Sequence, residues 1–415
     1  ALMPPEVSHH ICIAQVIVTA AGAVRQLLDN AIDAGATNIE ISTRNFGIDS
    51  ISVADNGSGI PETSFGAICK PHSTSKLTEY DDLLSLNTLG FRGEALNALC
   101  ALADVTITTR TDDSNYGHLL VFDRNGNITR REITSRETGT TIEARSLFVP
   151  LPVRRREFER TAKRDFSRLL VTVQEFALLR PDVRFNVFSH TQHGRHHALA
   201  TPGGSNSTLS TVIGSLFAGK GSRIIAVEPM DAIEDAREQL GERAADDVNQ
   251  IFVRGFVSSC GLGEGFLTRA GGSERQFVFV NGRPVDYPRL TRLANEVYQQ
   301  YNQGQFPLLI LHISMPRAWV DVNVTPEKRT VFCQKEKLLL CSARSSLLAA
   351  FKPFAGTMTS LEEKSPKAER SFSGFALTQS PIRLRSQQQQ QQQQQLSAIS
   401  AHSQHRRGGG GRDAE

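Results

Sequence analysis

Polar side chains near the beginning of the chain are spaced so that they could bind a phosphorylated ligand. Gln26, Asn30 and Asp33 lie at positions i, i+4 and i+7, which places them on one face of a helix. The segment Asp55–Ile60 follows a predicted strand, and its glycines would let a ligand approach the backbone closely. The ordinary alternatives are a solvated helix face for the first group and a tight hairpin turn for the second.

Glycines also precede a predicted helix in Leu89–Leu96, which reads Leu-Gly-Phe-Arg-Gly-Glu-Ala-Leu. Backbone N–H groups at a helix start have no intrahelical partner, and the helix dipole favours an anion there. The segment therefore indicates a phosphate site, although an ordinary helix cap fits the same residues. Four further segments are candidates that a loop, or a strand with a turn, would also explain: His72–Lys76, Thr138–Thr141, Val278–Pro284 and Val320–Arg329.

These segments need a scaffold, and hydrophobic periodicity predicts mixed helices and strands on both sides of a boundary at Thr201–Thr208. The helix that carries Asn30 has an apolar stripe and is expected to end at Gly35. That stripe consists of Val24, Leu27, Leu28, Ala31 and Ile32. The other predicted helices are one starting at Pro61, Asn97–Leu102, Glu157–Leu179 and Pro288–Tyr301. The predicted strands include Ile39–Ile41, Ile48–Val53, Val105–Thr109, Phe252–Phe256, Gln276–Val280, Leu308–Ile313 and Val320–Val324.

Composition excludes some protein classes and leaves others open. The chain has 415 residues, of which 39% are hydrophobic and 21% charged, and this is typical of globular domains. Its net charge of +3 comes from the last sixty residues, so bulk charge gives no indication of nucleic-acid binding. No segment approaches the roughly 20 consecutive apolar residues that a membrane span needs, and we expect no secretory signal. Six scattered cysteines favour neither disulfides nor zinc, and indicate a reducing compartment.

Taken in order, the candidate segments resemble the nucleotide-binding fold of the GHKL superfamily. The resemblance rests on Asn-x-x-Asp-Ala-Gly, Asp-x-Gly-x-Gly, Gly-Phe-Arg-Gly-Glu-Ala-Leu and Gly-Thr-Thr. Within that superfamily, the third motif is similar to MutL homologues, as are His-x-Thr-Ser-Lys, Asn-Gly-Arg-Pro and Asp-Val-Asn-Val-Thr-Pro-x-Lys. Leu147–Arg154 and Asp286–Tyr301 resemble the eukaryotic PMS type, and the whole resemblance covers about residues 7–350.

The resemblance implies an α/β fold built of α+β two-layer sandwiches. A GHKL Bergerat-type ATP-binding domain would occupy residues 1–205. A smaller ribosomal-protein-like βαβ transducer domain with a DNA-facing groove would follow at 206–352. Residues 353–415 contain the glutamine run Gln387–Gln395, and this composition predicts a disordered linker because it buries too little apolar surface.

ATP and Mg²⁺ are the cofactors that the resemblance implies. Asn30 would coordinate Mg²⁺ at the phosphates, since its amide oxygen is a hard ligand, and Asp55 would accept a hydrogen bond from the adenine amino group. Lys328 would reach the γ-phosphate from the second domain, so that ATP but not ADP joins the two domains. The other implied nucleotide-site residues are Asp33, Gly57, Gly59, Ser75, Lys76, Gly90, Phe91, Arg92, Gly93, Glu94, Ala95, Leu96 and Thr140, or its neighbour Thr141.

One position departs from the family. The general base of the family is a glutamate four residues before the magnesium asparagine, and here that residue is Gln26. A neutral amide can orient a water but cannot take its proton, so hydrolysis should be slower by about 10²–10⁴. Asp29 lies about 100° around the helix from Asn30 and is not expected to substitute. The alternative is a mild adjustment in a working enzyme.

DNA contact is the second expected activity. The residues from 154 to 168 hold seven cations and three acids, among them Arg154, Arg155 and Arg156. A solvated helix face is the ordinary explanation, whereas the resemblance favours contact with the phosphate backbone. Arg283, in Asn-Gly-Arg, corresponds to a position on the DNA-facing groove of the family. The implied partners are DNA, another MutL homologue as a heterodimer partner and MutS-type mismatch-recognition proteins, with no membrane.

We therefore expect an ATP-gated DNA clamp of mismatch repair that is a weak ATPase and lies in the nucleus. The alternative is a hydrolysis-dead ATP-binding scaffold that binds DNA and a partner homologue. The motifs around Lys328 and Arg283 argue against a third class, namely a histidine kinase, type II topoisomerase or chaperone. No Asp-Gln-His-Ala-x-x-Glu type of metal motif occurs in the sequence, so we do not expect endonuclease activity from this chain.

Overall fold

The computed structural model describes residues 16–70, 94–217, 224–260, 275–302, 305–321 and 329–353. Residues 1–360 form one compact unit, and residues 361–415 lie outside the described ranges. The predicted glutamine-rich linker therefore falls outside them, apart from Pro353. Several predicted site residues also lie outside the described ranges: Ser75, Lys76, Gly90, Phe91, Arg92, Gly93 and Lys328.

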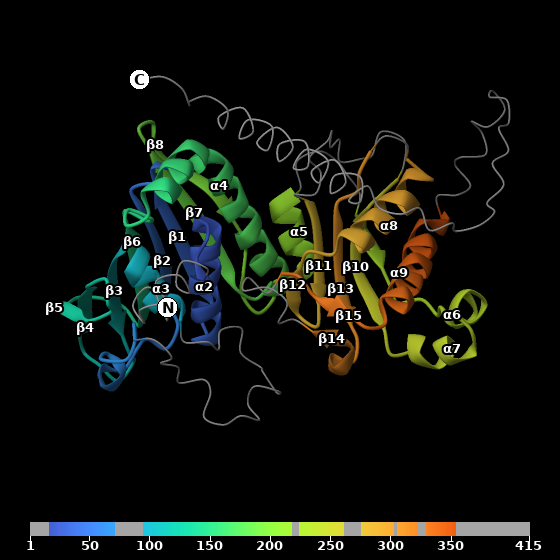
Figure 1. Ribbon diagram of the computed structural model, residues 1–415, viewed down its shortest axis with the longest axis horizontal. Coiled ribbons are helices and arrows are strands. Elements are labelled where there is room, and N and C mark those ends of the chain that lie inside the picture. Colours follow the sequence, from blue (N-terminus) through green and yellow to red (C-terminus); the bar gives the residue numbers. More distant parts are fainter. Residues whose placement is uncertain are drawn as a thin grey trace, which may run out of the picture. The chain divides into compact units, whose positions relative to one another are not determined.

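An eight-stranded sheet forms the first half of the fold (Figure 1). Its order is β5-β4-β3-β6-β2-β1-β7-β8; β1 and β7 are parallel, and the other neighbouring strands are antiparallel. Alternate residues are buried, as expected for strands with one covered face. The strands are β1 (Asn38–Arg44), β2 (Ser50–Asp55), β3 (Asp104–Arg110), β4 (Gly117–Phe122), β5 (Ile128–Thr134), β6 (Gly139–Arg145), β7 (Arg184–Thr191) and β8 (Gly194–Ala200).

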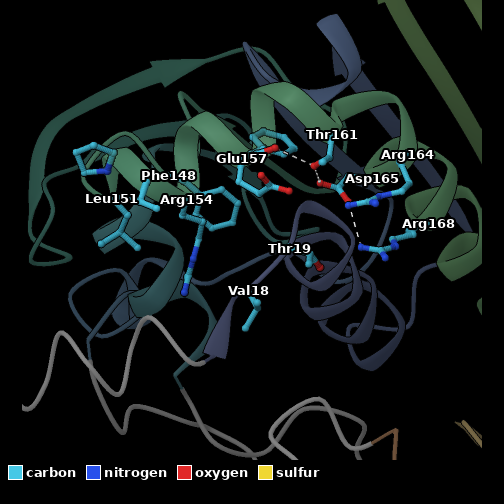
Figure 2. A pocket seen from close by; sticks show the side chains of 13 residues that line it. Val18, Thr19, Phe148, Leu151, Arg154, Glu157, Thr161, Arg164, Asp165 and Arg168 are labelled. Carbon is cyan, nitrogen blue, oxygen red and sulfur yellow. Dashed lines mark hydrogen bonds and ion pairs between the residues drawn. The ribbon is translucent and has the colours of Figure 1, made fainter. Parts of the chain in front are cut away.

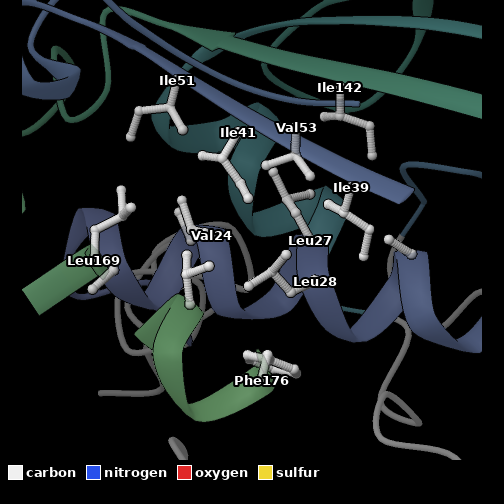
Figure 3. Packing of buried hydrophobic residues seen from close by; sticks show 14 of the residues in the cluster. Val24, Leu27, Leu28, Ile39, Ile41, Ile51, Val53, Ile142, Leu169 and Phe176 are labelled. Carbon is white, nitrogen blue, oxygen red and sulfur yellow. The ribbon is translucent and has the colours of Figure 1, made fainter. Parts of the chain in front are cut away.

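Three helices supply the apolar side chains that pack on this sheet: α2 (Ala20–Asp33), α3 (Ala95–Leu102) and α4 (Pro152–Leu179). Figure 3 shows Val24 and Leu28 of α2 lying beneath Ile41 of β1. These three side chains have no exposed surface, so the predicted apolar stripe is confirmed. Thr19 is the N-cap of α2, and its hydroxyl accepts a hydrogen bond from the Gly22 N–H. The helix ends before Gly35, whose φ is +75°.

A five-stranded sheet forms the second half, in the order β12-β11-β13-β10-β9. Both of its faces are buried, because alternate residues of the same strands belong to two different cores. Phe277, Phe279 and Ile310 pack with the first core, whereas Val278 and Leu311 pack with the second. The strands are β9 (Ile224–Val227), β10 (Phe252–Ser258), β11 (Gln276–Val280), β12 (Arg283–Val285) and β13 (Leu309–Ser314).

The helix α8 (Pro288–Gln299) lies between β11 and β13 in the sequence, and these two strands pair in parallel. This is the βαβ connection expected for parallel neighbours, with the β11–β12 hairpin included in it. The other elements of this half are the helices α5 (Leu209–Phe217), α6 (Ile233–Leu240), α7 (Glu242–Val248) and α9 (Glu336–Phe351), and a small sheet of β14 (Val320–Asp321) and β15 (Phe332–Cys333). The predicted α/β fold of two layered halves is confirmed.

Two local predictions, and the hairpin alternative for Asp55–Ile60, differ from the structure. The helix expected from Pro61 is only the short 3-10 helix η2 (Glu62–Ser64), because proline fixes φ but leaves ψ free, and Pro61 is extended with ψ 148°. The turn at Asp55–Ile60 does not close a hairpin, since β2 pairs with β1 and β6. The long helix begins at Pro152 rather than Glu157, with the proline in its first turn.

The predicted boundary near residue 205 lies in the connection between β8 and α5. The first apolar core continues across it, because Val212 and Ile213 of α5 pack there together with Phe277 of β11. The domain limits of 205 and 352 stay predictions.

Within the described ranges, no helix combines the length and the apolar character that crossing a bilayer requires. The cysteines there, Cys69, Cys100, Cys260, Cys333 and Cys341, are free thiols, as their spacing predicts. No group of three or more His, Cys, Asp or Glu side chains in the same ranges is arranged to hold a metal ion.

We expect Leu28→Ala to lower the free energy of unfolding by about 2–5 kcal/mol, because Leu28 is fully buried between α2 and the sheet. Val153→Ala is the control, since Val153 is 83% exposed and its truncation should cost less than about 0.5 kcal/mol. Chemical denaturation measures both. Equal midpoints for the two variants would contradict the packing described here.

Candidate nucleotide-binding site

The first group of candidate residues lies where three neighbouring strands of the first sheet come together. Asp55 is the last residue of β2 and is paired with Thr140 on β6, which in turn is paired with Thr109 on β3. Residues paired across antiparallel strands lie on the same face, so the carboxylate and the two hydroxyls are neighbours. The Thr109 and Thr140 Oγ1 atoms are 3.1 Å apart, and the Ile60 N–H donates to Thr109 Oγ1 at 2.9 Å.

The Asp55 carboxylate is held in one orientation by backbone donors. Its Oδ1 accepts hydrogen bonds from the N–H groups of Gly57, at 2.8 Å, and Thr140, at 3.3 Å. Burial raises the pKa of the Asp55 carboxyl, while these two bonds and the Arg136 guanidinium oppose the rise. Within the described ranges no hydrogen bond ends on Oδ2, so both backbone bonds to the Asp55 carboxylate fall on Oδ1.

Arg136 organises the same site, although no motif or spacing in the sequence singles it out. Its guanidinium donates to the backbone oxygens of Asp55, at 3.1 Å, and Gly139, at 3.2 Å, and also to the Thr141 hydroxyl. It therefore fastens the end of β2 to the start of β6. An arginine between two predicted strands is a common feature of sequences. Only the three-dimensional structure shows that Arg136 bridges β2 and β6.

The glycines beside Asp55 are required by contacts within the protein itself. Gly59 has φ +73°, and a Cβ added there would stand 2.1 Å from the backbone oxygen of Arg110. At Gly57 a Cβ would stand 2.8 Å from the Cβ of Ala34. The two glycines therefore let the loop after β2 lie directly against β3 and the end of α2, which brings Asp55 close to α2.

Helix α2 presents its polar stripe beside this loop. Gln26, Asn30 and Asp33 are all partly exposed, as is Asp29, while the opposite side of the helix is in the core. The predicted face is therefore present, with amide and carboxylate oxygens of the kind that suit Mg²⁺. Of the predicted phosphate segment, Glu94 caps α3, and Ala95 and Leu96 are the first residues of that helix.

Two arginines from the second half of the chain approach α2. Arg283 follows a tight turn in which Asn281 and Gly282 both have positive φ, as a two-residue hairpin requires. Burial lowers the pKa of Arg283, and Asp29 and Asp33 of α2 oppose this effect. The side chain predicted to face DNA is thus partly buried within Coulombic reach of α2.

Arg329 forms the second connection. It donates hydrogen bonds to Glu175 of α4 at 3.0 Å and to Asp286 at 2.8 Å. Glu175 is buried and also forms an ion pair with Arg25 of α2, the residue before Gln26. Sequence reasoning missed all four of these residues, because only the folded chain brings them together.

The arginines at the start of α4 differ in how far their side chains are exposed, because Arg154 and Arg155 are partly buried and Arg156 is not. Arg154 donates to the Ile17 backbone oxygen, and Arg155 donates to the backbone oxygens of Ile48 and Leu147. Arg156 is exposed to solvent. Of the three arginines predicted to contact DNA, Arg156 is therefore the one whose side chain is most available to a phosphate.

A cavity of about 640 Å³ lies beside the same helix (Figure 2), and Asp55 is not among the residues that line it. Phe148, Leu151 and Phe158 form its apolar wall, and Arg164 and Arg168 line its polar side. Asp165 accepts hydrogen bonds from Thr161 at 2.8 Å and Arg168 at 3.3 Å, so part of this charge is neutralised internally.

Two protein families match separate parts of the chain. Residues 18–146 match the histidine kinase-, DNA gyrase B-, and HSP90-like ATPases, and this region holds α2, Asp55 and Thr140. Residues 234–351 match the family described as DNA mismatch repair protein, C-terminal domain, and this region holds Arg283 and Arg329. The partner of Arg329 in the first half, Glu175, lies between the two matched segments.

Individual relatives agree with these families. The chain is 38% identical over 348 residues to the mismatch repair endonuclease PMS2 of Homo sapiens, which covers 83% of this chain and 39% of that protein. It is 38% identical over 343 residues to the DNA mismatch repair protein PMS1 of Arabidopsis thaliana, covering 82% and 35%. A crystal structure of the N-terminal domain of a DNA repair protein is 33% identical, with a TM-score of 0.70, and the match covers 84% of this chain and 99% of that one. The chain spans about two fifths of the length of these curated relatives.

We expect Gly59→Ala to destabilise the fold more than Gly35→Ala does, and to weaken nucleotide binding. Both glycines have positive φ, which costs alanine about 1–2 kcal/mol, but only Gly59 would also meet a backbone oxygen. Gly66→Ala is the control for a glycine with neither constraint. Denaturation midpoints and nucleotide titrations compare the three. If Gly59→Ala were no worse than Gly35→Ala, the close packing of the loop on β3 would be wrong.

Proposed function

The chain belongs to the PMS type of the MutL family of DNA mismatch repair proteins, and from this premise we propose that its ATPase domain is the ATP-gated part of a DNA clamp. The observation that carries the proposal is the position of Asp55. Its oriented carboxylate stands beside two buried threonines and the polar stripe of α2, inside the segment that matches the ATPase family. An adenine site next to a phosphate site is what such a clamp needs.

The described residues suit a purine nucleotide. Asp55 accepts a hydrogen bond from the exocyclic amino group of adenine through Oδ2, and the hydroxyl of Thr140 lies beside the base. Asn30 supplies an amide oxygen to Mg²⁺, and when bound this ion neutralises phosphate charge. We assign the phosphates to the start of α3, at Glu94, Ala95 and Leu96, because backbone N–H groups at a helix start favour an anion.

Coupling between ATP and the second half of the chain is assigned to Lys328. This residue lies outside the described ranges, but its neighbour Arg329 contacts Glu175 of the first half. A cation at position 328 that binds only a terminal phosphate distinguishes ATP from ADP, and so makes closure depend on ATP. Hydrolysis then removes the contact and reopens the clamp.

The rate of hydrolysis is set by Gln26. The side chain orients the attacking water through its amide but cannot remove the proton, so we assign a slow turnover to this ATPase. Asp29 does not replace the missing carboxylate, because it lies about 100° around α2 from Asn30, whereas Gln26 lies about 40° away. A second candidate function is therefore a scaffold that binds ATP without hydrolysing it, and Gln26 is the observation that favours it.

DNA, a second MutL homologue and MutS-type mismatch-recognition proteins are the proposed partners, and the nucleus is the proposed location. Exposed Arg156 is the best candidate for a contact with the DNA phosphate backbone, because Arg154 and Arg155 already bind backbone oxygens. Arg283 fits a role at α2 better than a direct DNA contact, since Asp29 and Asp33 offset its charge. Contacts of this kind weaken steeply with added salt and depend little on base sequence.

Asn30→Ala should lower the affinity for a non-hydrolysable ATP analogue by at least about tenfold in the presence of Mg²⁺, the scale typical of a disturbed metal site. It should have little further effect in EDTA, because the amide acts through the ion. Isothermal titration of the variant and the wild type in both buffers makes this comparison. Asn125→Ala, an exposed turn residue, is the control. Unchanged affinity in Mg²⁺ would refute the assignment of Asn30.

Gln26→Glu should raise the rate of ATP hydrolysis by about 10²–10⁴, because the new carboxylate acts as a general base. Phosphate release at saturating ATP measures this rate, and Gln299→Glu adds the same charge at an exposed site as a control. Equal turnover in the wild type and Gln26→Glu would rule out the scaffold function. A complete lack of turnover in Gln26→Glu would instead overturn the ATPase assignment.

A further inference from the structure

Four charged side chains connect α2 and α4 to the second half of the chain. Glu175 of α4 is buried, with 5% of its side chain exposed, and it accepts hydrogen bonds from Arg25 of α2 and Arg329. The Arg329 Nη2–Glu175 Oε1 distance is 2.9 Å, and Nη1 reaches Oε2 at 3.0 Å. Arg329 also binds Asp286, through its side chain at 2.8 Å and through its backbone oxygen, which accepts the Asp286 N–H.

The charges in this cluster balance, with two guanidinium groups and two carboxylates. A buried carboxylate without a partner costs several kcal/mol, so Glu175 is stable here only while arginines surround it. Burial lowers the pKa of Arg329, but Asp286 and Glu175 outweigh this and raise it above its usual value. Arg25 also lies over the ring of Phe176, 5.6 Å from its centroid. The two guanidinium groups and two carboxylates of the cluster therefore compensate one another.

Both arginines adjoin positions to which the proposed function gives a role at the terminal phosphate. Arg25 precedes Gln26 directly, and Arg329 follows Lys328 directly. Successive Cα atoms are about 3.8 Å apart, so whatever restrains Arg25 and Arg329 also restrains the backbone next to those positions. Glu175 binds both arginines with one carboxylate, although 150 residues separate it from Arg25 and 154 from Arg329.

We propose that Glu175 is a positioning residue, which binds Arg25 and Arg329 together and so holds the second half of the chain in register with α2 for triphosphate recognition. This inference rests on the proposed function, because the recognition it supports is that of ATP over ADP. Glu175 touches no reacting atom in this assignment. Its effect passes through Arg329 to the adjoining position 328, to which the proposed function assigns the recognition of the terminal phosphate.

The test removes the connection between the halves and leaves the Arg25–Glu175 pair intact. In Arg329→Met, Glu175 keeps Arg25, and Asp286, whose side chain is 57% exposed, returns to water. We expect the affinity ratio of a non-hydrolysable ATP analogue to ADP to fall at least about tenfold, within the range typical of coupling between sites. The affinity for ADP should change less than twofold. Titrations use the full chain, and thermal melting confirms that the variant is folded.

Arg289→Met is the matched control, because Arg289 pairs with Glu336 within the second half of the chain. It should leave the ratio of analogue to ADP affinity within twofold of the wild type. Glu175→Gln provides a second variant with nearly the same shape, and it should lower the ratio as Arg329→Met does. The double variant should lose no more than the larger single loss, since both changes break one contact.

The outcomes separate this inference from the proposed function. If the wild type prefers the analogue over ADP and Arg329→Met keeps that preference, Glu175 has only a structural role and the inference is wrong. If the wild type itself binds the analogue no more tightly than ADP, the proposed ATP-dependent coupling is wrong, whatever the variants show. Should Glu175→Gln not fold, the result for Arg329→Met against Arg289→Met decides the question alone.

Discussion

The need to compensate buried charge is the physical constraint on which this structure depends. A carboxylate removed from water is destabilising unless donors or cations replace the lost hydration, and Asp55 and Glu175 each meet this condition differently. Asp55 accepts hydrogen bonds from backbone N–H groups of its own loop and of β6. Glu175 accepts hydrogen bonds from two guanidinium groups on elements far away in the sequence. One carboxylate thereby organises the candidate nucleotide site and the other connects the two halves.

Helix α2 contributes to the core, to the candidate nucleotide site and to the ion pair with Glu175, because its sides face different environments. Val24 and Leu28 pack on the sheet, Gln26 and Asn30 lie on the partly exposed stripe, and Arg25 turns towards α4. A rigid helix transmits displacement from one side to another without bending. Displacement of Arg329 would act on Arg25 through Glu175 and so move the polar stripe of α2, which gives the proposed coupling a mechanical basis.

Electrostatics also changes the assessment of the predicted DNA contacts. A basic segment in a sequence suggests an open cationic surface, but Arg154 and Arg155 donate to backbone oxygens around the start of α4. These contacts hold both guanidinium groups against the backbone. The same reasoning applies to Arg283, whose charge is offset by acids on α2. The exposure of each cationic side chain, rather than the number of cations in the segment, is therefore the criterion for a phosphate contact.

The sequence by itself determined the apolar stripe of α2, most strand positions around it and the polar face with Gln26 and Asn30, because periodicity reports which side of an element is buried. It also determined the motif order that identified the family. Only the tertiary structure decided that Arg25 is buried against Glu175, that Arg136 fastens β2 to β6, and that Pro61 opens no long helix. The physical reason is that the sequence does not indicate the partner of a charged or polar residue. The fold determines that partner, because it brings elements that are distant in the sequence into contact.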